Sequence, residues 1–210
     1  MQPINLIGYS GHAYVVCEIL HSVGRMPHGY FEQEAKVQNP FGLQYLGPET
    51  ADEALERLKN QDFFVAIGDN RIRQKIHTAI LQRSGRVPVS VLHRGGSFST
   101  FAKHGAGLML CNRAVVHPMT LVGDGVIINT AAVVEHECQI GDFAHIAPGA
   151  ILCGNVSVGE HSFVGAGAVV IQGIRIGKNV MIGAGAVVIR DVPDGATVVG
   201  NPQRPVLAKK

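Results

Sequence analysis

The second half of this sequence repeats every six residues. From residue 122 onward the first position of each hexad is always aliphatic: Val122, Ile128, Val134, Ile140, Ile146, Leu152, Val158, Val164, Val170, Ile176, Ile182 and Val188. The fifth position is small or β-branched throughout: Val126, Ala132, Cys138, Ala144, Ala150, Val156, Ser162, Ala168, Ile174, Val180, Ala186 and Val192. Both positions are therefore predicted to face inward, and a repeat of this period predicts a parallel β-helix.

Each hexad is expected to form one flat side of a prism, with a short strand across each hexad boundary. The frame continues weakly upstream through Val116, Leu110 and Phe98 and stops near Pro193. Glycine fills the second position six times, and we expect these glycines to adopt positive φ where the chain turns a corner: Gly123, Gly141, Gly159, Gly165, Gly177 and Gly183.

The first 93 residues are predicted to form a small α/β domain. Strands are expected at 4–7, 29–31, 44–46, 63–67 and 89–92, and helices at 12–23, 51–59 and 70–82. This alternation predicts a parallel sheet covered by helices, with ligands at the carboxyl ends of the strands. We expect three segments: an α/β domain at 1–93, a β-helix at 94–193 and a C-terminal tail at 194–210.

The turn Gly-Tyr-Ser-Gly at 8–11 joins the first strand to the first helix. It lacks the full GxGxxG dinucleotide fingerprint, because Ser10 stands where the second glycine belongs. A glycine-containing turn that opens a helix offers backbone N–H groups to an anion such as a diphosphate, although a tight turn without a ligand fits equally. The loops at 8–12 and 68–70 are expected to face one crevice.

Composition restricts the function further. A net charge of +2 with scattered basic residues argues against nucleic-acid binding. No apolar run reaches the length of a membrane span, and the N-terminus lacks a signal-peptide pattern, so we expect a cytoplasmic enzyme without a membrane partner. The four cysteines show no metal-ligand spacing, and Cys138 is expected to be an inert core thiol.

A resemblance covers essentially the whole chain. The order GYSGH, AIGDN with Arg73, VVEHECQIGDFAHIAPGAILCGNV and VVGNP resembles the sialic acid O-acetyltransferase and bacterial aminosugar N-acetyltransferase family, the NeuD/PglD type. This resemblance implies a left-handed parallel β-helix of three-sided, 18-residue coils. It also implies a homotrimer that transfers acetyl from acetyl-CoA, the acyl donor, to a sugar carried on a nucleotide diphosphate, without a metal.

His136 is the candidate general base. It occupies the third position of its hexad between the inward Val134 and Cys138, so its ring is expected to point out of the prism. An imidazole titrates near neutrality and suits proton removal from an acceptor. The resemblance makes Glu137 its partner, with Glu135 the alternative.

Gly154 follows His136 by 18 residues, one full coil along, and the resemblance makes its N–H the oxyanion donor.

The resemblance assigns the remaining site residues. His145, expected to point outward, contacts acetyl-CoA, as do Ala166 and Ala184, again 18 residues apart. The acceptor nucleotide is expected to meet the N-terminal crevice. Its predicted contacts are Ser10, Gly11, His12, Glu32 and Gly68. Glu32 is followed by Gln33 where many family members carry a second acid, which leaves the nucleotide open.

Several functions remain open at this stage. The favoured one is N-acetylation of a nucleotide-linked amino sugar, such as a UDP-4-amino-4,6-dideoxy sugar, and the near alternative is O-acetylation of a sialic-acid-type sugar. A metalloenzyme like the γ-class carbonic anhydrases would need a histidine set for zinc. A non-catalytic sugar-nucleotide-binding trimer would use only the crevice.

Overall fold

The computed structural model describes residues 4–206. Contacts within the chain divide it into two compact units, with the boundary between Arg94 and Gly95. The end of the expected C-terminal tail, residues 207–210, lies outside the described residues.

The N-terminal unit contains a four-stranded parallel sheet with the order β3-β2-β1-β4. Its elements run β1 (Ile4–Ile7), α1 (Gly11–Ser22), β2 (Pro27–Phe31), β3 (Gln44–Tyr45), α2 (Asp52–Asn60), β4 (Asp62–Val65), α3 (Asn70–Ser84) and β5 (Val91–Leu92). The predicted parallel sheet with helices is confirmed, with bounds shifted by a few residues. β5 does not belong to this sheet.

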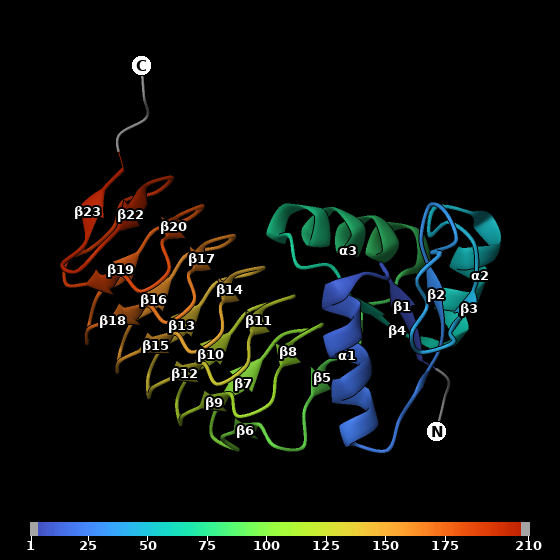
Figure 1. Cartoon of the computed structure of the whole chain (residues 1–210), viewed down its shortest axis with the longest axis horizontal. Coiled ribbons are helices and arrows are strands. Elements are labelled where there is room, and N and C mark those ends of the chain that lie inside the picture. The colour runs from blue at the N-terminus through green and yellow to red at the C-terminus, as the bar shows by residue number, and fades with distance from the viewer. Residues whose placement is uncertain (1–3, 207–210) are drawn as a thin grey trace. The chain divides into compact units, whose positions relative to one another are not determined.

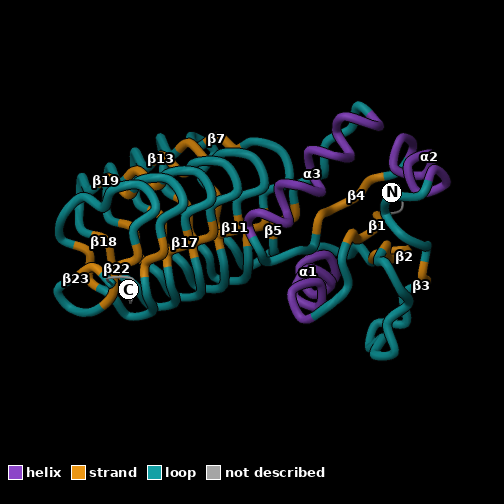
Figure 2. The backbone as a smooth tube through the Cα atoms, turned by 90° about the horizontal axis from the view of Figure 1, so that it is seen from above, coloured by secondary structure: helices purple, strands orange, loops and turns teal. Residues whose placement is uncertain are grey.

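Successive residues of each strand serve opposite faces of this sheet. Ile7, Phe31 and Phe63 pack with Leu58 of α2 and Ile80 of α3 in one buried cluster. Figure 2 shows α1 on the other side of the sheet from α2 and α3. With both faces covered, ligands can reach the sheet at its strand ends, where β1 leads into α1 and β4 leads into α3.

The C-terminal unit is a three-sided stack of short parallel strands (Figure 1). One wall contains β6 (Ser97–Phe98), β9 (Val115–Val116), β12 (Val133–Val134), β15 (Ile151–Leu152), β18 (Val169–Val170) and β21 (Val187–Val188). The second contains β7 (Lys103–His104), β10 (Leu121–Val122), β13 (Gln139–Ile140), β16 (Ser157–Val158) and β19 (Arg175–Ile176). The third runs through β8 (Met109–Leu110), β11 (Ile127–Ile128), β14 (His145–Ile146), β17 (Phe163–Val164), β20 (Met181–Ile182) and β22 (Thr197–Val199), which pairs with β23 (Arg204–Pro205).

Stacking in 18-residue steps buries both predicted inward positions. Val116 pairs with Val134 and Val134 with Leu152, and the other walls keep the same step up to the last coil. Every first and fifth position from residue 122 to 192 is buried, and Ile174 is the most exposed of them at 8%. The aliphatic first positions and the small fifth positions therefore fill the prism together, as expected from the repeat.

The second-position glycines do not adopt positive φ, so that prediction is wrong. The left-handed conformation occurs at the fourth position, where glycine is often absent: Glu137 (φ 60), Phe143 (φ 55) and His161 (φ 59) are examples. At these six glycines a side chain would collide with the next coil. A Cβ on Gly159 would lie 2.5 Å from the carbonyl carbon of Gly177.

The 18-residue frame ends near Pro193, but the prism continues. Val192 bridges to Ile176 and Val198 pairs with Ile182, each a step of 16 residues. The last coil is therefore two residues shorter than the others, and β22 extends the stack beyond the predicted end of the β-helix.

Candidate active site

His136 lies at the corner that follows β12, with its side chain 54% exposed. The residue after it, Glu137, has the left-handed backbone conformation of the fourth position. Glu137 Oε2 lies 3.0 Å from His136 Nδ1. A carboxylate accepts a hydrogen bond, so Nδ1 carries the proton in the neutral ring and Nε2 is left as the acceptor. The pair thus has the arrangement of an oriented general base.

Glu135, the alternative partner, points elsewhere. Its Oε1 lies 3.7 Å from Nε2 of His117, a residue that the sequence did not single out. His117 and Glu135 follow Val116 and Val134, which pair in neighbouring coils. Two imidazole–carboxylate pairs therefore stand at one corner, and the one containing His136 uses Glu137.

Gly154 lies directly against the His136 ring. A Cβ built on Gly154 would be 2.5 Å from His136 Cε1 and 2.7 Å from Nε2. The Asn155 N–H donates to the His136 carbonyl at 2.8 Å, which fixes the two coils together at this point. Glycine leaves the imidazole in this position, because any side chain at residue 154 would displace the ring.

The Gly154 N–H also differs from its counterparts at another corner. There, the third-position N–H groups of Ala106, Asp124 and Lys178 donate to the carboxylates of Asp124, Asp142 and Asp194, at 2.7, 2.9 and 2.8 Å respectively. Within residues 4–206, no protein acceptor takes the Gly154 N–H. A donor beside the imidazole is therefore free to bind a negative oxygen.

His145 points outward, as expected, but neighbouring side chains cover it. It lies on the outer side of β14, next to the inward Ile146, but it is only 8% exposed. The Phe163 ring packs edge-on against it, with the ring centres 4.9 Å apart, and Asn129 Nδ2 lies 3.1 Å from its Nε2. Asn129 was missed in the sequence, although β11 and β14 pair in the 18-residue register.

Ala166 and Ala184 lie at a different corner from His136. Both are exposed third-position residues, which follow β17 and β20 in neighbouring coils. The Gly185 N–H donates to the Ala166 carbonyl at 2.8 Å and joins these coils. One chain therefore brings Ala166 and Ala184 together in an uncrowded row, but it does not bring them to His136.

The N-terminal turn forms as the sequence predicts. Gly8 takes φ 87 and its N–H donates to the Phe31 carbonyl at 2.9 Å, which ties the end of β1 to β2. Ser10 is the N-cap of α1, and its side chain makes no capping hydrogen bond. Gly11 starts the helix, and a Cβ placed there would meet no atom within 4 Å. The start of the helix is therefore open.

The two predicted loops do meet. A Cβ on Gly68 would be 3.6 Å from His12 Cγ. Below them, Arg73 is 2% exposed and its guanidinium donates to the Gly68 carbonyl at 2.9 Å and to Ile67 O at 3.1 Å. Burial, with a smaller effect of Arg73, lowers the pKa of His12 to about 4, so this imidazole is neutral at pH 7. Arg73 supplies the positive charge in this region.

Glu32 already has partners. Its Oε2 accepts the Tyr9 N–H at 3.1 Å and lies 3.3 Å from Lys36 Nζ. A hollow of about 520 Å³ adjoins it, lined by Tyr9, Ser10, Gly11, Tyr14, Lys36, Val37 and Gln38. Glu32 therefore holds the turn after β1 against the loop after β2, and Lys36 lies at the hollow.

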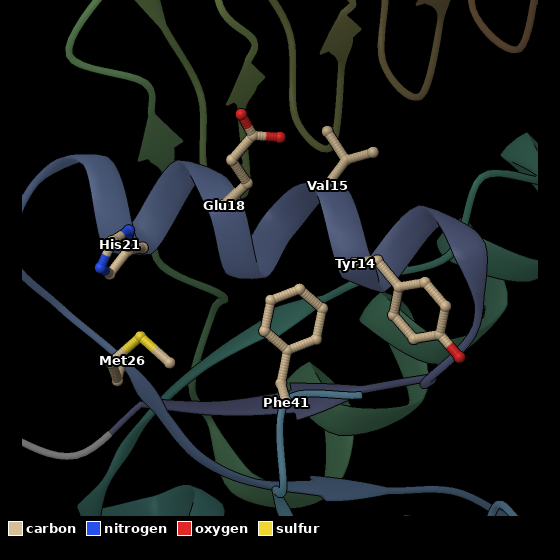
Figure 3. A pocket seen from close by; sticks show the side chains of 6 residues that line it. All are labelled: Tyr14, Val15, Glu18, His21, Met26 and Phe41. Carbon is tan, nitrogen blue, oxygen red and sulfur yellow. The ribbon is translucent and has the colours of Figure 1, made fainter. Parts of the chain in front are cut away.

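A second hollow lies along α1 (Figure 3). It has a volume of about 540 Å³ and is lined by Tyr14, Val15, Glu18, His21, Met26 and Phe41. Tyr14 also lines the first hollow, and its ring centre is 5.8 Å from that of Phe41. None of the predicted site residues lines this second hollow.

No group of three or more His, Cys, Asp or Glu side chains that could bind a metal occurs in the described part of the chain. Cys138 is fully buried, and burial raises the pKa of its thiol to about 11. It therefore packs as a small apolar side chain, as predicted. Among the described helices, none combines the length and apolarity of a membrane span.

Two family models match the chain. Residues 3–80 match the PglD N-terminal domain, and residues 155–190 match the bacterial transferase hexapeptide repeat. A search of curated proteins finds no match.

Solved structures match almost the whole chain. One is the acetyltransferase domain of PglB from Neisseria gonorrhoeae FA1090 with acetyl coenzyme A: 36% identity, TM-score 0.90, covering 98% of this chain and 99% of that one. Another is PerB from Caulobacter crescentus with CoA and GDP-perosamine, which has 35% sequence identity and a TM-score of 0.90, with 98% of each chain covered. WeeI from Acinetobacter baumannii AYE matches at 25% with TM-score 0.81, covering 98% and 100%. The hexapeptide-repeat match and these acetyltransferases identify the prism as a left-handed β-helix.

Proposed function

This chain belongs to the NeuD/PglD-type family of hexapeptide-repeat sugar acetyltransferases, and we propose that it acetylates the amino group of a nucleotide-linked amino sugar. It is an acyltransferase that uses acetyl-CoA as the acyl donor. The observation that carries the proposal for the site is the His136–Glu137 pair lying against Gly154, whose N–H has no protein acceptor within residues 4–206. Those groups supply a base and an oxyanion donor, which are the two things acetyl transfer needs.

The chemistry then follows from the positions of these groups. The neutral amine attacks the thioester carbonyl, and His136 Nε2 takes the proton that the nitrogen loses. The Gly154 N–H donates to the oxyanion of the tetrahedral intermediate. The carbon–sulfur bond breaks, and the imidazolium returns the proton to the departing thiolate. Glu137 orients the ring throughout through Nδ1.

We assign the nucleotide part of the acceptor to the crevice around Ser10, Gly11, His12, Glu32 and Gly68. The open N-terminus of α1 provides N–H groups for a diphosphate, and Arg73 and Lys36 supply positive charge nearby. Because His12 is neutral at pH 7, its contribution is a hydrogen bond. The relative in complex with GDP-perosamine supports a nucleotide sugar as the acceptor.

We also propose that the protein is a homotrimer with composite active sites. The outward residues of the β6–β21 wall form an aliphatic row: Val115, Val133, Ile151, Val169 and Val187. Ile151 is 38% exposed in the single chain. Since Ala166 and Ala184 lie at a different corner from His136, acetyl-CoA can contact all of them only where two subunits meet. His145 is assigned to the same donor site.

We place the enzyme in the cytoplasm, because acetyl-CoA and nucleotide-activated sugars are cytoplasmic metabolites. No membrane partner or nucleic acid is required by this chemistry.

The test is a substrate screen. Purified protein is incubated with acetyl-CoA and a panel of UDP- and GDP-linked 4-amino sugars, with free sialic acids included, and released thiol and product mass are measured. We expect acetylation of an amino sugar and a mass increase of one acetyl group. Acetylation of sialic acids alone would favour the O-acetyltransferase alternative. If none of the acceptors in the panel caused thiol release, the proposal would be refuted.

A further inference from the structure

The pair formed by His117 and Glu135 lies beside the proposed base and has no role so far. Both residues are partly exposed, 42% for the His117 side chain and 37% for Glu135. The His117 N–H donates to the Val134 carbonyl at 2.9 Å, so His117 is fixed one coil before Glu135. An exposed pair of polar side chains contributes little to stability, so stability alone does not account for its position.

The direction of the His136 ring separates the two sides of the site. The ring covers Gly154, which belongs to the following coil, and the proposed donor contacts Ala166 and Ala184 belong to later coils still. The acetyl group is thereby assigned to the C-terminal side of His136. His117 belongs to the preceding coil, so it lies on the opposite side, which is left for the acceptor sugar.

The separation of the pair suits a ligand oxygen. At 3.7 Å, His117 Nε2 and Glu135 Oε1 are too far apart for a direct hydrogen bond. Within the described residues neither side chain makes another hydrogen bond. A hydroxyl group both donates and accepts, so one hydroxyl can donate to the carboxylate and accept from the imidazole N–H.

Given the proposed function, we infer that His117 and Glu135 bind the sugar hydroxyl next to the amino group that is acetylated. Substituents on neighbouring ring carbons lie closer together than one coil spacing, about 4.8 Å. We place the amine at His136 Nε2 and its neighbouring hydroxyl toward the preceding coil, at the His117–Glu135 pair. The pair determines specificity for vicinal amino alcohols among the acceptors.

The experiment uses acetyl-CoA with the nucleotide-linked 4-amino sugar that the wild type acetylates best in the panel, and with its analogue lacking the neighbouring hydroxyl. Loss of this hydrogen-bonded contact is expected to lower kcat/KM of the wild type about 10-fold on the deoxy analogue. His117→Ala and Glu135→Gln are expected to raise the acceptor KM about 10-fold on the hydroxylated sugar and to show no further loss on the analogue. The KM for acetyl-CoA should stay unchanged.

Glu160→Gln is the matched control. It breaks another exposed pair between neighbouring coils, with Lys178 Nζ 3.1 Å from Glu160 Oε1, at a different corner. This variant is expected to keep the full penalty for the missing hydroxyl. Variants of His117 and Glu135 that keep the same penalty as wild type, or that change only thermal stability, would overturn the inference. A wild type that acetylates no amino sugar would instead refute the proposed function, and the inference with it.

Discussion

The close approach between Gly154 and His136 makes Gly154→Ala an informative substitution. The added methyl group would lie 2.5 Å from His136 Cε1, whereas ordinary contacts begin at 3.4 Å, so the ring must move by about 0.9 Å. The backbone of Gly154 is not left-handed, so alanine itself is tolerated there. The substitution therefore acts by displacing the imidazole.

The expected effect is large on turnover and small on stability. Moving the ring by this amount disturbs the 3.0 Å contact of Nδ1 with Glu137 and shifts Nε2 from the acceptor. A misplacement of about 1 Å can cost roughly 100-fold in rate. Because the ring is 54% exposed, it can swing into solvent, so the melting temperature should change by only a few degrees.

The assay is a double-variant cycle measured by thiol release. His136→Ala alone should lower kcat by about 10²- to 10⁴-fold. Adding Gly154→Ala to it should cost nothing more, because the ring that the methyl group displaces is absent. If Gly154→Ala retained wild-type turnover, or lowered kcat equally in both backgrounds, the displacement argument would be wrong. The second result would point to the N–H of residue 154 instead.

Three further predictions concern other parts of the molecule. Gly11→Val should raise the acceptor KM and leave the acetyl-CoA KM unchanged, since the side chain fills the open start of α1 without a clash. If the folded variant had the same acceptor KM as the wild type, the crevice would be excluded as the nucleotide site. The folded pKa of His12, about 4, lies below its ordinary value of 6.5, so stability present above pH 6.5 is lost as pH falls toward 4. Between pH 7 and 5 the loss in free energy of unfolding from His12 amounts to about 2 kcal/mol. Urea unfolding at fixed protein concentration should show that His12→Gln removes this loss. The same dependence of stability on pH in the variant and the wild type would contradict this. Val169→Glu, in the aliphatic outer row, should convert the trimer to monomers in light scattering and abolish activity, whereas Gln139→Glu on another wall should do neither. A monomeric wild type with full activity at high dilution would refute the trimer.

The repeat predicted the prism because the residues that recur every six positions are also the aliphatic residues that fill its interior. Aliphatic residues such as Val134 and Ile146 recur where the wall faces inward, and no other period would bury them all. The conformation at the corners was not predictable in this way. Glycine or asparagine fills many of the left-handed fourth positions, such as Gly125, Gly149 and Asn155, but others hold Glu137, Phe143 and His161. Glycine also recurs at the second position, where the backbone lies close to the next coil, so the glycine pattern alone did not distinguish the two positions.

The site residues also fall into those that the repeat placed correctly and those whose surroundings depend on a neighbouring coil. The repeat placed the His136 ring outward and Gly154 one coil along, and the resemblance supplied the roles of these two residues. The burial of His145 was not expected, since it depends on Phe163 one coil later, and the partner of Glu135 depends on His117 one coil earlier. These contacts connect residues that are distant in sequence, and they become predictable only once the three-sided register is known.

The 18-residue register also sets how this protein can change in length. Inserting one complete coil returns every corner to its place and moves the later coils by about 4.8 Å along the axis. Such an insertion after Ala184 leaves all the proposed site residues in their relative positions. Between His136 and Gly154 the same insertion would separate the base from the oxyanion donor by a whole strand spacing. By this reasoning the prism can lengthen after Ala184, while the coils before it are held at constant length.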